Sequence, residues 1–154
     1  MLVLADSGVL LRLLQRTDPE HAVVRQALRI LRGRGDTIVV SPQNAAEFWN
    51  VCTRPQAARG GLGLTFAETD RRLRIIERVF DVIPDSATTY ALWRQLVTAH
   101  DVMGVRVHDA RLVAWMRAWG ISHILTLNPS DFVRYQPIVT AIHPRDLAAP
   151  APTA

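Results

Sequence analysis

The sequence predicts an α/β fold, a three-layer α/β/α sandwich around a central, mainly parallel five-stranded sheet. Short apolar segments alternate with amphipathic helical segments along the chain, an order typical of parallel sheets. The strand segments are apolar throughout, as expected for strands covered on both faces. The chain has no internal repeat, and its 154 residues are enough for one domain with a full core.

The first third of the chain contains two expected helices after an N-terminal strand at residues 2–5. Ser7 directly follows this strand and is expected to cap a helix that carries four leucines, the last of them Leu14. Residues 17–20 have the spacing of a capping box with a proline in the first turn. A second helix is therefore expected to run to about Arg32, where two glycines end it.

The middle of the chain repeats the order of strand and helix. Residues 37–40 are β-branched and predict a short buried strand, and Ser41 with the following proline predicts the start of a helix that ends near Thr53. Residues 54–64 form a Gly-rich, Arg-bearing loop. A second capping box at residues 65–68 predicts a helix that runs to about Val79.

The last part of the chain supplies the remaining strands and two more helices. A strand at 80–83 ends before a proline, and Asp85 or Ser86 is expected to cap the helix that runs through Val97. Residues 101–107 are a loop, and a sixth helix is expected at 108–120. Two final strands are expected at 123–127 and 137–142. The expected domain is 1–143, followed by a loose Pro/Ala-rich tail at 144–154.

Composition restricts the possible functions. The net charge is +4 and the pI is about 10.5, and all 18 basic residues are arginine, which permits a nucleic-acid partner. Without lysine, a Walker A phosphate loop is excluded. The one cysteine, Cys52, excludes an internal disulfide and a multi-cysteine zinc site and favours a reducing cytoplasm. No apolar run is long enough for a transmembrane helix, and the N-terminus lacks the features of a signal peptide, so no membrane partner is expected.

Four carboxylates occur near the ends of predicted strands or in the first turns of the next helix. They are Asp6, Glu47, Asp109 and Asp131. The carboxyl ends of parallel strands share one edge of the sheet, where ligands bind, so these side chains are expected to converge. Two unit charges ~4 Å apart repel by about 4 kcal/mol at an effective dielectric near 20, so such a cluster needs a cation or shared protons. Carboxylate oxygens favour Mg²⁺, with Mn²⁺ as a substitute.

Each acid also has an ordinary explanation. Asp6 could stabilise a helix N-terminus, Glu47 could be a surface residue paired with Arg54, and Asp131 could be a loop or capping acid. Asp109 has the strongest independent argument. It lies on the helical stripe of Leu112, Val113 and Met116, which turns it towards the interior, where an unpaired acid is costly.

The order of these motifs resembles the PIN domain, most closely the toxin nucleases of VapBC toxin–antitoxin pairs. The matching segments are residues 6–10 (Asp-Ser-Gly-Val-Leu), Glu47, residues 108–112 (His-Asp-Ala-Arg-Leu) and residues 125–132 (Leu-Thr-Leu-Asn-Pro-Ser-Asp-Phe). The resemblance extends from the N-terminus to about Pro144.

The resemblance implies a magnesium-dependent ribonuclease, generally dimeric and often inhibited by a small antitoxin. It assigns the acidic site to the same four carboxylates, and accessory polar positions to Ser7, Thr126 and Asn128. Gly8 departs from the family pattern, because many members carry a small polar residue there.

A mechanism follows as a hypothesis. Asp6 and Asp109 would hold the metal directly or through water, while Glu47 and Asp131 would complete the negative pocket, bind a second ion or orient the attacking water. Ser7 would bond to a ligand carboxylate or a metal-bound water. Arginines at the rim are expected to hold the RNA backbone. The candidates are Arg54, Arg59, Arg106 and Arg111.

Three other functions compete with a toxin ribonuclease. One is a non-catalytic PIN-like module that binds RNA or regulates a partner, which the presence of all four acids opposes. Another is a phospho-receiver or phosphatase, which the absence of lysine opposes. The third is a subunit that only sequesters another protein. Tryptophan and apolar residues on the predicted helices also suggest a homodimer.

Overall fold

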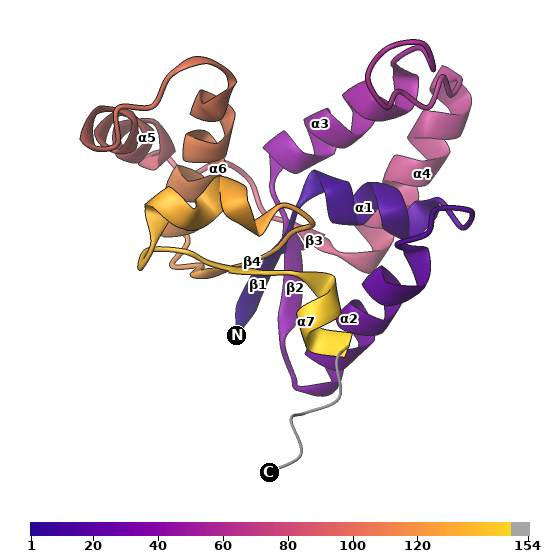
Figure 1. Cartoon of the computed structure of the whole chain (residues 1–154), viewed down its shortest axis with the longest axis horizontal. Coiled ribbons are helices and arrows are strands. Elements are labelled where there is room, and N and C mark those ends of the chain that lie inside the picture. Colours follow the sequence, from indigo (N-terminus) through magenta and orange to yellow (C-terminus); the bar gives the residue numbers. More distant parts are fainter. Residues whose placement is uncertain (149–154) are drawn as a thin grey trace.

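The computed structural model describes residues 1–148, in which five strands form one all-parallel sheet of order β3-β2-β1-β4-β5 (Figure 1). The strands are β1 (Leu2–Ala5), β2 (Thr37–Val40), β3 (Asp81–Val82), β4 (His123–Leu125) and β5 (Thr140–Ile142). The predicted fold class is therefore confirmed.

Within residues 1–148, six α-helices and two 3₁₀ helices connect the strands, and a seventh α-helix follows the last strand. They are α1 (Ser7–Leu14), α2 (His21–Gly33), α3 (Pro42–Thr53), α4 (Phe66–Val79), α5 (Thr89–Ala99), η1 (Gly104–Arg106), α6 (Val107–Ala118), η2 (Pro129–Tyr135) and α7 (Pro144–Ala148). Two expected caps are present. The Ser41 hydroxyl accepts the backbone N–H of Asn44 at 3.1 Å, and the Thr65 hydroxyl accepts the backbone N–H of Glu68 at 3.2 Å. None of these helices is long and apolar enough to cross a membrane.

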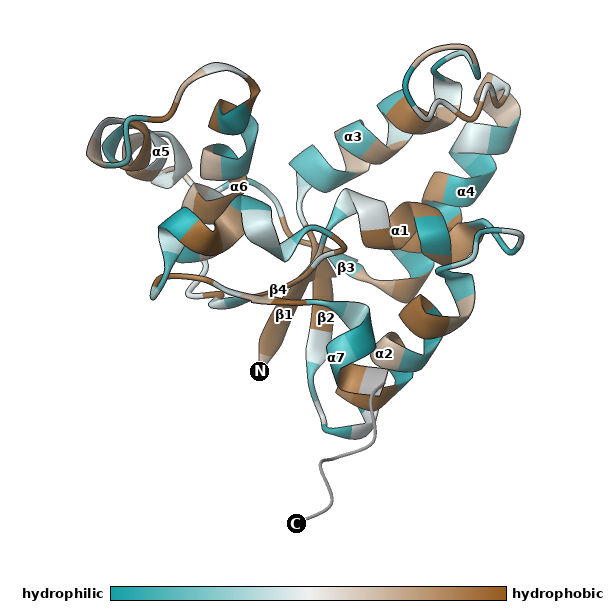
Figure 2. Cartoon of the chain, viewed as in Figure 1, coloured by the Kyte–Doolittle hydropathy of each residue, from teal (hydrophilic) through white to brown (hydrophobic). Residues whose placement is uncertain are grey.

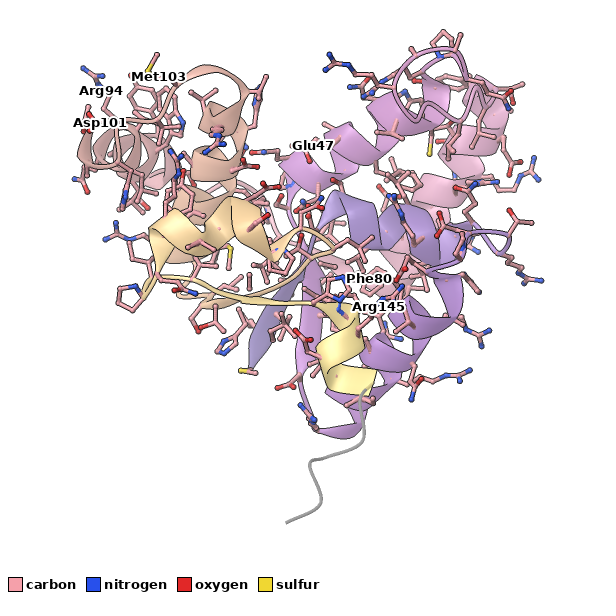
Figure 3. The ribbon with its side chains drawn as sticks, in the orientation of Figure 1. Glu47, Phe80, Arg94, Asp101, Met103 and Arg145 are labelled. Atoms are coloured by element: carbon pink, nitrogen blue, oxygen red, sulfur yellow. The ribbon has the colours of Figure 1, made fainter. Side chains whose placement is uncertain are left out.

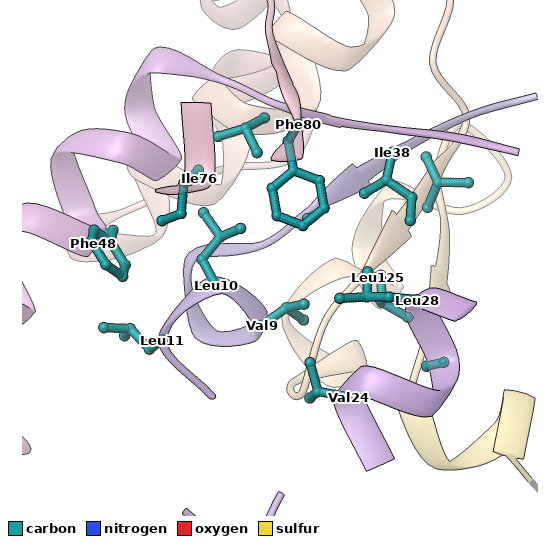
Figure 4. Close-up of a cluster of buried hydrophobic side chains, with 14 of the residues drawn as sticks. Val9, Leu10, Leu11, Val24, Leu28, Ile38, Phe48, Ile76, Phe80 and Leu125 are labelled. Carbon is teal, nitrogen blue, oxygen red and sulfur yellow. The ribbon is translucent and has the colours of Figure 1, made fainter. Parts of the chain in front are cut away.

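The sheet separates two apolar cores because neighbouring strand residues face opposite sides. In β1, Val3 and Ala5 face a core built with α1, α2, α3 and α4, whereas Leu4 faces a core built with α5, α6 and η2. Figure 4 shows the first core, where Phe80 and Ile76 lie near Leu10. The central strands β1 and β2 are strongly hydrophobic (Figure 2). This three-layer arrangement leaves the strand ends free to carry polar groups.

Several boundaries differ from those predicted. The capping-box residues 17–20 do not begin a helix, because Asp18 instead accepts the backbone N–H of Glu20 at 2.8 Å and holds a turn, so α2 begins at His21. Helix α5 begins at Thr89 rather than near residue 85, since the Thr89 hydroxyl accepts the Ser86 amide at 3.2 Å.

Helix α6 and the last strands also differ from the prediction. Helix α6 begins one residue early, at Val107, and ends at Ala118. The last three strands are shorter than expected. Strand β3 lacks one residue at each end, and β4 ends two residues early. Strand β5 begins three residues late, because the amides of Ile138 and Val139 bond to the Tyr135 carbonyl in a turn. Near β4, the Thr126 amide still bonds to Ile142, but residues 126–128 then turn towards the strand edge.

The C-terminal tail was predicted to be loose from residue 144, and this is wrong for its first five residues. Residues 144–148 form α7, which packs against α2 (Figure 1). Pro144 is buried, Leu147 contacts the first core, and Arg145 forms an ion pair with Glu20. Tertiary packing therefore stabilises a helix too short to form alone. The remaining predicted tail, 149–154, lies outside the described residues.

Candidate metal and nucleic-acid site

The candidate site lies at the carboxyl edge of the sheet, between β1 and β4. Strand β1 has β2 on one side and β4 on the other. After β1 the chain adds β2 and β3 in one direction and then β4 and β5 in the opposite direction, so the strand order reverses between β1 and β4. Open α/β sheets bind ligands at such a point. The backbone N–H of Asp6 donates to the Leu125 carbonyl at 3.0 Å, which fixes the first acid at the start of the crevice.

Asp6 is held in one orientation by hydrogen bonds to both carboxylate oxygens. Its Oδ1 accepts the backbone N–H of Ser7 at 2.7 Å, as the cap of α1, and its Oδ2 accepts the hydroxyl of Thr126 at 2.7 Å. Burial raises the pKa of Asp6, the hydrogen bonds from Thr126 and Ser7 oppose this effect, and the charge of Glu47 adds to it. Asn128 contributes through its backbone, whose N–H donates to the Thr126 hydroxyl at 3.1 Å.

Glu47 is joined to Asp6 through one hydroxyl. Ser7 Oγ donates to Glu47 Oε2 at 3.0 Å and lies 3.4 Å from Asp6 Oδ1. Glu47 lies on α3, on the side that faces α6 (Figure 3). Its other oxygen, Oε1, accepts from the amide of Gln43 at 2.9 Å, one helical turn earlier. Both oxygens of Glu47 are therefore held in place, as those of Asp6 are.

Gln43 was missed by sequence reasoning. Its Nε2 also donates to the His108 carbonyl at 2.9 Å, at the start of α6, and its Oε1 accepts from Arg111 at 3.0 Å. The only signal in the sequence was its position four residues before Glu47, on the same face of the helix. Gln43 thus connects α3 to the helix that carries Asp109.

Asp109 and Asp131 complete the acidic cluster. Asp109 is partly buried in the first turn of α6, and Asp131 is exposed in η2. Burial, and then the charges of Asp131, Asp6 and Glu47 in that order of effect, together raise the pKa of Asp109 to about 6. Each of the other three acids raises the pKa of Asp109, so all four predicted acids lie close enough for their charges to interact.

This donor set fits a hard divalent cation. Within residues 1–148, no arginine lies within 4 Å of any of the four carboxylates as an ion-pair partner, so their charge is not neutralised by the protein. The same residues contain no ready-made group of three acid, cysteine or histidine side chains that could hold an ion. Mg²⁺ commonly binds through one or two carboxylates and keeps several waters, which matches an open acidic cluster.

The four predicted RNA-binding arginines lie in different places. Arg106 lines a small cavity together with Asp109 and Asp131. Arg111 is held by Gln43 and, at 2.8 Å, by an ion pair with Asp85. Both of these arginines are close to the acids.

Arg54 and Arg59 lie in another part of the molecule. The Arg54 guanidinium donates to the Arg59 carbonyl at 2.9 Å, at the C-terminal end of α3. The loop that contains them lies at the tip of the α3–α4 pair (Figure 1). The structure therefore does not bring these two arginines to the acidic cluster. Sequence reasoning also missed Arg134 of η2, which lines the cavity beside Arg106.

Comparisons with known proteins agree with this geometry. A PIN domain family model matches residues 3–136. The fold is similar to VapBC2 from Rickettsia felis bound to a DNA fragment from their promoter, with 15% identity, TM-score 0.69, and coverage of 93% of this chain and 98% of that chain. It is also similar to VapBC-1 from nontypeable Haemophilus influenzae, with 12% identity, TM-score 0.67, and coverage of 94% and 99%.

A third similar structure is Mycobacterium tuberculosis VapC20, described as a sarcin-ricin loop cleaving toxin. It has 18% identity and TM-score 0.57, with coverage of 79% of this chain and 86% of that chain. Comparison with curated proteins finds no match. At these identities the structural likeness establishes the fold, whereas the family model establishes the family.

Proposed function

The chain belongs to the PIN domain family, and we propose that it is a Mg²⁺-dependent endoribonuclease, the toxin of a toxin–antitoxin pair. One observation carries the proposal. The pKa of Asp109 is raised to about 6 by burial and then by three other carboxylates, none of which has an arginine partner within residues 1–148. Such a concentration of negative charge destabilises the metal-free protein and favours a cation.

Asp6 and Asp109 would hold the ion, and Mn²⁺ would substitute for Mg²⁺. Glu47 and Asp131 would contribute through water or hold a second ion. When bound, the ion would lower the pKa of a water and polarise a phosphate oxygen of the RNA. Water would attack phosphorus, and the bond to the 3′ oxygen would break, leaving a 5′-phosphate and a 3′-hydroxyl.

The protein's own part in this reaction is positioning. The backbone N–H of Ser7 and the hydroxyl of Thr126 fix the direction of the Asp6 lone pairs, and the Ser7 hydroxyl and Gln43 fix Glu47. Ligand carboxylates that are held by such hydrogen bonds bind metal more tightly, by about 10- to 100-fold. The Asp109 carboxylate would be largely ionised above about pH 6, ready to bind the ion.

A small antitoxin is the proposed protein partner. The similar structures from Rickettsia felis and Haemophilus influenzae are VapBC proteins. In this chain, a groove of about 650 Å³ lies between α1, α2 and α4, with Leu13, Leu14 and Ile75 beside Arg25 and Arg72. An amphipathic segment with acidic residues would complement this surface. Growth arrest on expression, relieved by the small protein of an adjacent gene, is the expected result; expression without effect on growth would contradict the toxin role.

A homodimer is the proposed assembly. Just before α6, Met103 is 80% exposed and Val105 of η1 is 82% exposed, and Tyr90 on α5 is 70% exposed. Figure 3 shows Met103 on the outer side of the molecule, next to Arg94. Exposed apolar side chains of this kind are typical of contact surfaces. Sedimentation equilibrium should give twice the monomer mass, and Met103→Glu should shift it to the monomer.

The nuclease proposal is tested by cleavage of a 5′-labelled mixed RNA pool. Wild type should cleave with Mg²⁺ and stop with a chelator, and Asp6→Asn and Asp109→Asn should each lose activity by at least about 100-fold. Asp81→Asn is the matched control, because this exposed carboxylate of β3 forms no ion pair within residues 1–148. Cleavage that persists with the chelator, or in both site variants, would overturn the proposal.

A further inference from the structure

A pocket of about 400 Å³ lies where the chain leaves β3, at the carboxyl edge of the sheet. This volume is within the range of roughly 300–1,000 Å³ that is typical of small-molecule sites. Its walls are the loop after β3, the first turns of α5, and α6, which packs against α5 (Figure 1). Its polar and aromatic lining residues are Asp85, Ser86, Thr89, Tyr90, Trp93 and Arg111. None of the four acids of the candidate metal site is among them.

The loop after β3 is held in place by bonds from α6. The indole N–H groups of Trp115 and Trp119 both donate to the Pro84 carbonyl, at 3.2 and 3.0 Å. The Arg111 guanidinium donates to Asp85 Oδ2 at 2.8 Å. The pocket is therefore formed before any ligand arrives, so binding does not have to order this loop.

Two aromatic rings give the pocket a surface that suits a flat ligand. The ring centroids of Tyr90 and Trp93 are 5.8 Å apart, and the ring planes are inclined by 37°. Trp93 is half-buried, and its indole N–H donates to the Val107 carbonyl at 3.1 Å, which fixes the ring. Tyr90 is largely exposed. Unpaired nucleobases stack on accessible aromatic rings of this kind.

Asp85 and Arg111 supply charged groups that a ligand can reach, since their side chains are 44% and 38% exposed. Within residues 1–148, Arg111 uses two of its five N–H donors, for Asp85 and Gln43, and Asp85 Oδ1 has no hydrogen-bond partner. The pocket therefore offers carboxylate acceptors beside guanidinium donors. The Watson–Crick edge of guanine carries two neighbouring N–H donor groups and one carbonyl oxygen, whereas each other base carries one donor group there. Guanine is the base that matches this pair best.

The pocket is connected to the acidic cluster through Gln43. Arg111 donates to Gln43 Oε1 at 3.0 Å, and Gln43 Nε2 donates to Glu47 Oε1 at 2.9 Å. Neighbouring strands are about 4.8 Å apart, so the ends of β1 and β3, with β2 between them, are about 10 Å apart along the same edge. One RNA strand that follows this edge can thus place a base in the pocket and a nearby phosphate at the acids.

We propose that this pocket binds an unpaired guanine base of the RNA, stacked on Tyr90 and Trp93 and bonded at its Watson–Crick edge by Asp85 and Arg111. The inference rests on the proposed ribonuclease function and adds a site of base recognition to it. The acids act on phosphate, which every nucleotide carries, so they select no sequence by themselves. The pocket selects which phosphodiester bond reaches them.

Fluorescence anisotropy in EDTA, where RNA stays intact, tests the pocket with fluorescein-labelled RNA 12-mers. One 12-mer is all uridine, and the others carry a single central guanosine, adenosine or cytidine. Wild type should bind the guanosine 12-mer about 10-fold more tightly than the other three. Asp85→Asn should remove this preference, because the amide replaces one acceptor oxygen by a donor. Asp70→Asn is the matched control and should keep it, since Asp70 forms an ion pair with Arg74 on α4, also at 2.8 Å.

The aromatic wall is tested by Tyr90→Ala. This variant should bind the guanosine 12-mer about 10-fold more weakly than wild type, because the base loses a stacking surface. Phe66→Ala is the control, an equally exposed aromatic side chain on α4. Tyr90 also belongs to the surface proposed for the dimer, so the same loss should appear in the Met103→Glu background, where dimer contacts are already disrupted. A loss that disappears in that background would assign Tyr90 to the dimer and overturn its role in the pocket.

Two further results would overturn the proposal. One is equal affinity of wild type for the four 12-mers, or a guanosine preference that survives Asp85→Asn. The other is guanosine monophosphate raising the melting temperature of wild type but not of Asp85→Asn while RNA binding is the same in both, since the pocket would then serve a free nucleotide.

The cleavage assay keeps the two proposals distinct. If wild type does not cleave RNA but prefers the guanosine 12-mer through Asp85, the pocket stands and the nuclease function fails. If wild type cleaves RNA, and both Asp85→Asn and Tyr90→Ala bind and cleave as it does at the same positions, the nuclease function stands and the pocket fails.

Discussion

Asp109→Asn is expected to stabilise the metal-free protein at about pH 8 while removing its cleavage of RNA. The reason is the raised pKa of this carboxyl, which moves from 3.8 to about 6 on folding. The folded state therefore holds the proton more tightly than the unfolded state, so stability falls as the pH rises between these two values. The penalty is absent below about 3.8 and complete above about 6. Asparagine keeps the shape of the side chain and cannot ionise.

The size of the effect follows from the same two values. The difference between 3.8 and about 6 corresponds to roughly 3 kcal/mol at about 1.4 kcal/mol for each pH unit. Asp109 is only partly buried, so solvent screening reduces this to about 1–2 kcal/mol. For a chain of this size, 1 kcal/mol changes the melting temperature by about 2–4 °C. The variant should therefore melt about 2–8 °C higher than wild type.

The assay is thermal unfolding in EDTA at several pH values, followed by circular dichroism. The gap between variant and wild type should be complete near pH 8 and should close as the pH falls below about 3.8, because wild-type Asp109 is then largely neutral in both states. Added Mg²⁺ should raise the melting temperature of wild type and have a smaller effect on the variant. Asp81→Asn, taken through the same series, serves as the control.

Two results would refute this reasoning. If Asp109→Asn melts below wild type in EDTA near pH 8, the carboxylate has a favourable partner in the folded protein, and the cluster is not one of uncompensated charge. If the gap does not change with pH, the stabilisation comes from packing or hydrogen bonding rather than from ionisation.

Other predictions concern the support of the site and the limits of the domain. Thr126→Val should weaken Mg²⁺ binding about 10-fold, measured by titration of the melting temperature, because Asp6 loses one of its two fixing hydrogen bonds; unchanged affinity would remove this threonine from the site. Truncation after His143 should destabilise the chain by about 2 kcal/mol in urea unfolding because α7 is lost, and unchanged stability would show that α7 adds nothing to the first core. Gly61→Ala should cost about 1–3 kcal/mol in the same assay, since a Cβ there would lie 2.3 and 2.5 Å from two backbone carbonyl oxygens; equal stability would show that the loop adjusts.

Local sequence signals predicted the fold well, because its strands are uniformly apolar and its helices begin at ordinary caps. Ser41 and Thr65 cap α3 and α4 as their positions indicated. Where two local patterns competed, the prediction failed. Asp18 favours a turn over the first turn of a helix, and α7 exists only because Leu147 has a core to pack against.

The acids could be predicted because parallel strands bring their ends together, but the groups that surround them could not. Gln43 bonds to a helix far away in the sequence, and Arg134 comes beside Arg106 only in the folded chain, so no local pattern marks them. Arg54 shows the opposite error. It follows the helix of Glu47 closely in sequence, yet α3 carries it along the helix axis to the other end.

The bond from Gln43 to the His108 carbonyl connects helices that pack on opposite faces of the sheet. Glu47 belongs to a helix of the first core, next to buried Phe48, whereas Asp109 belongs to a helix of the second core, next to buried Ala110. The Arg111 guanidinium, also on α6, donates to Gln43 as well, so two hydrogen bonds near the surface hold these two acids at their separation. A bulky substrate could widen the acidic mouth by breaking both bonds, at a cost of about 2 kcal/mol, while both cores stay intact.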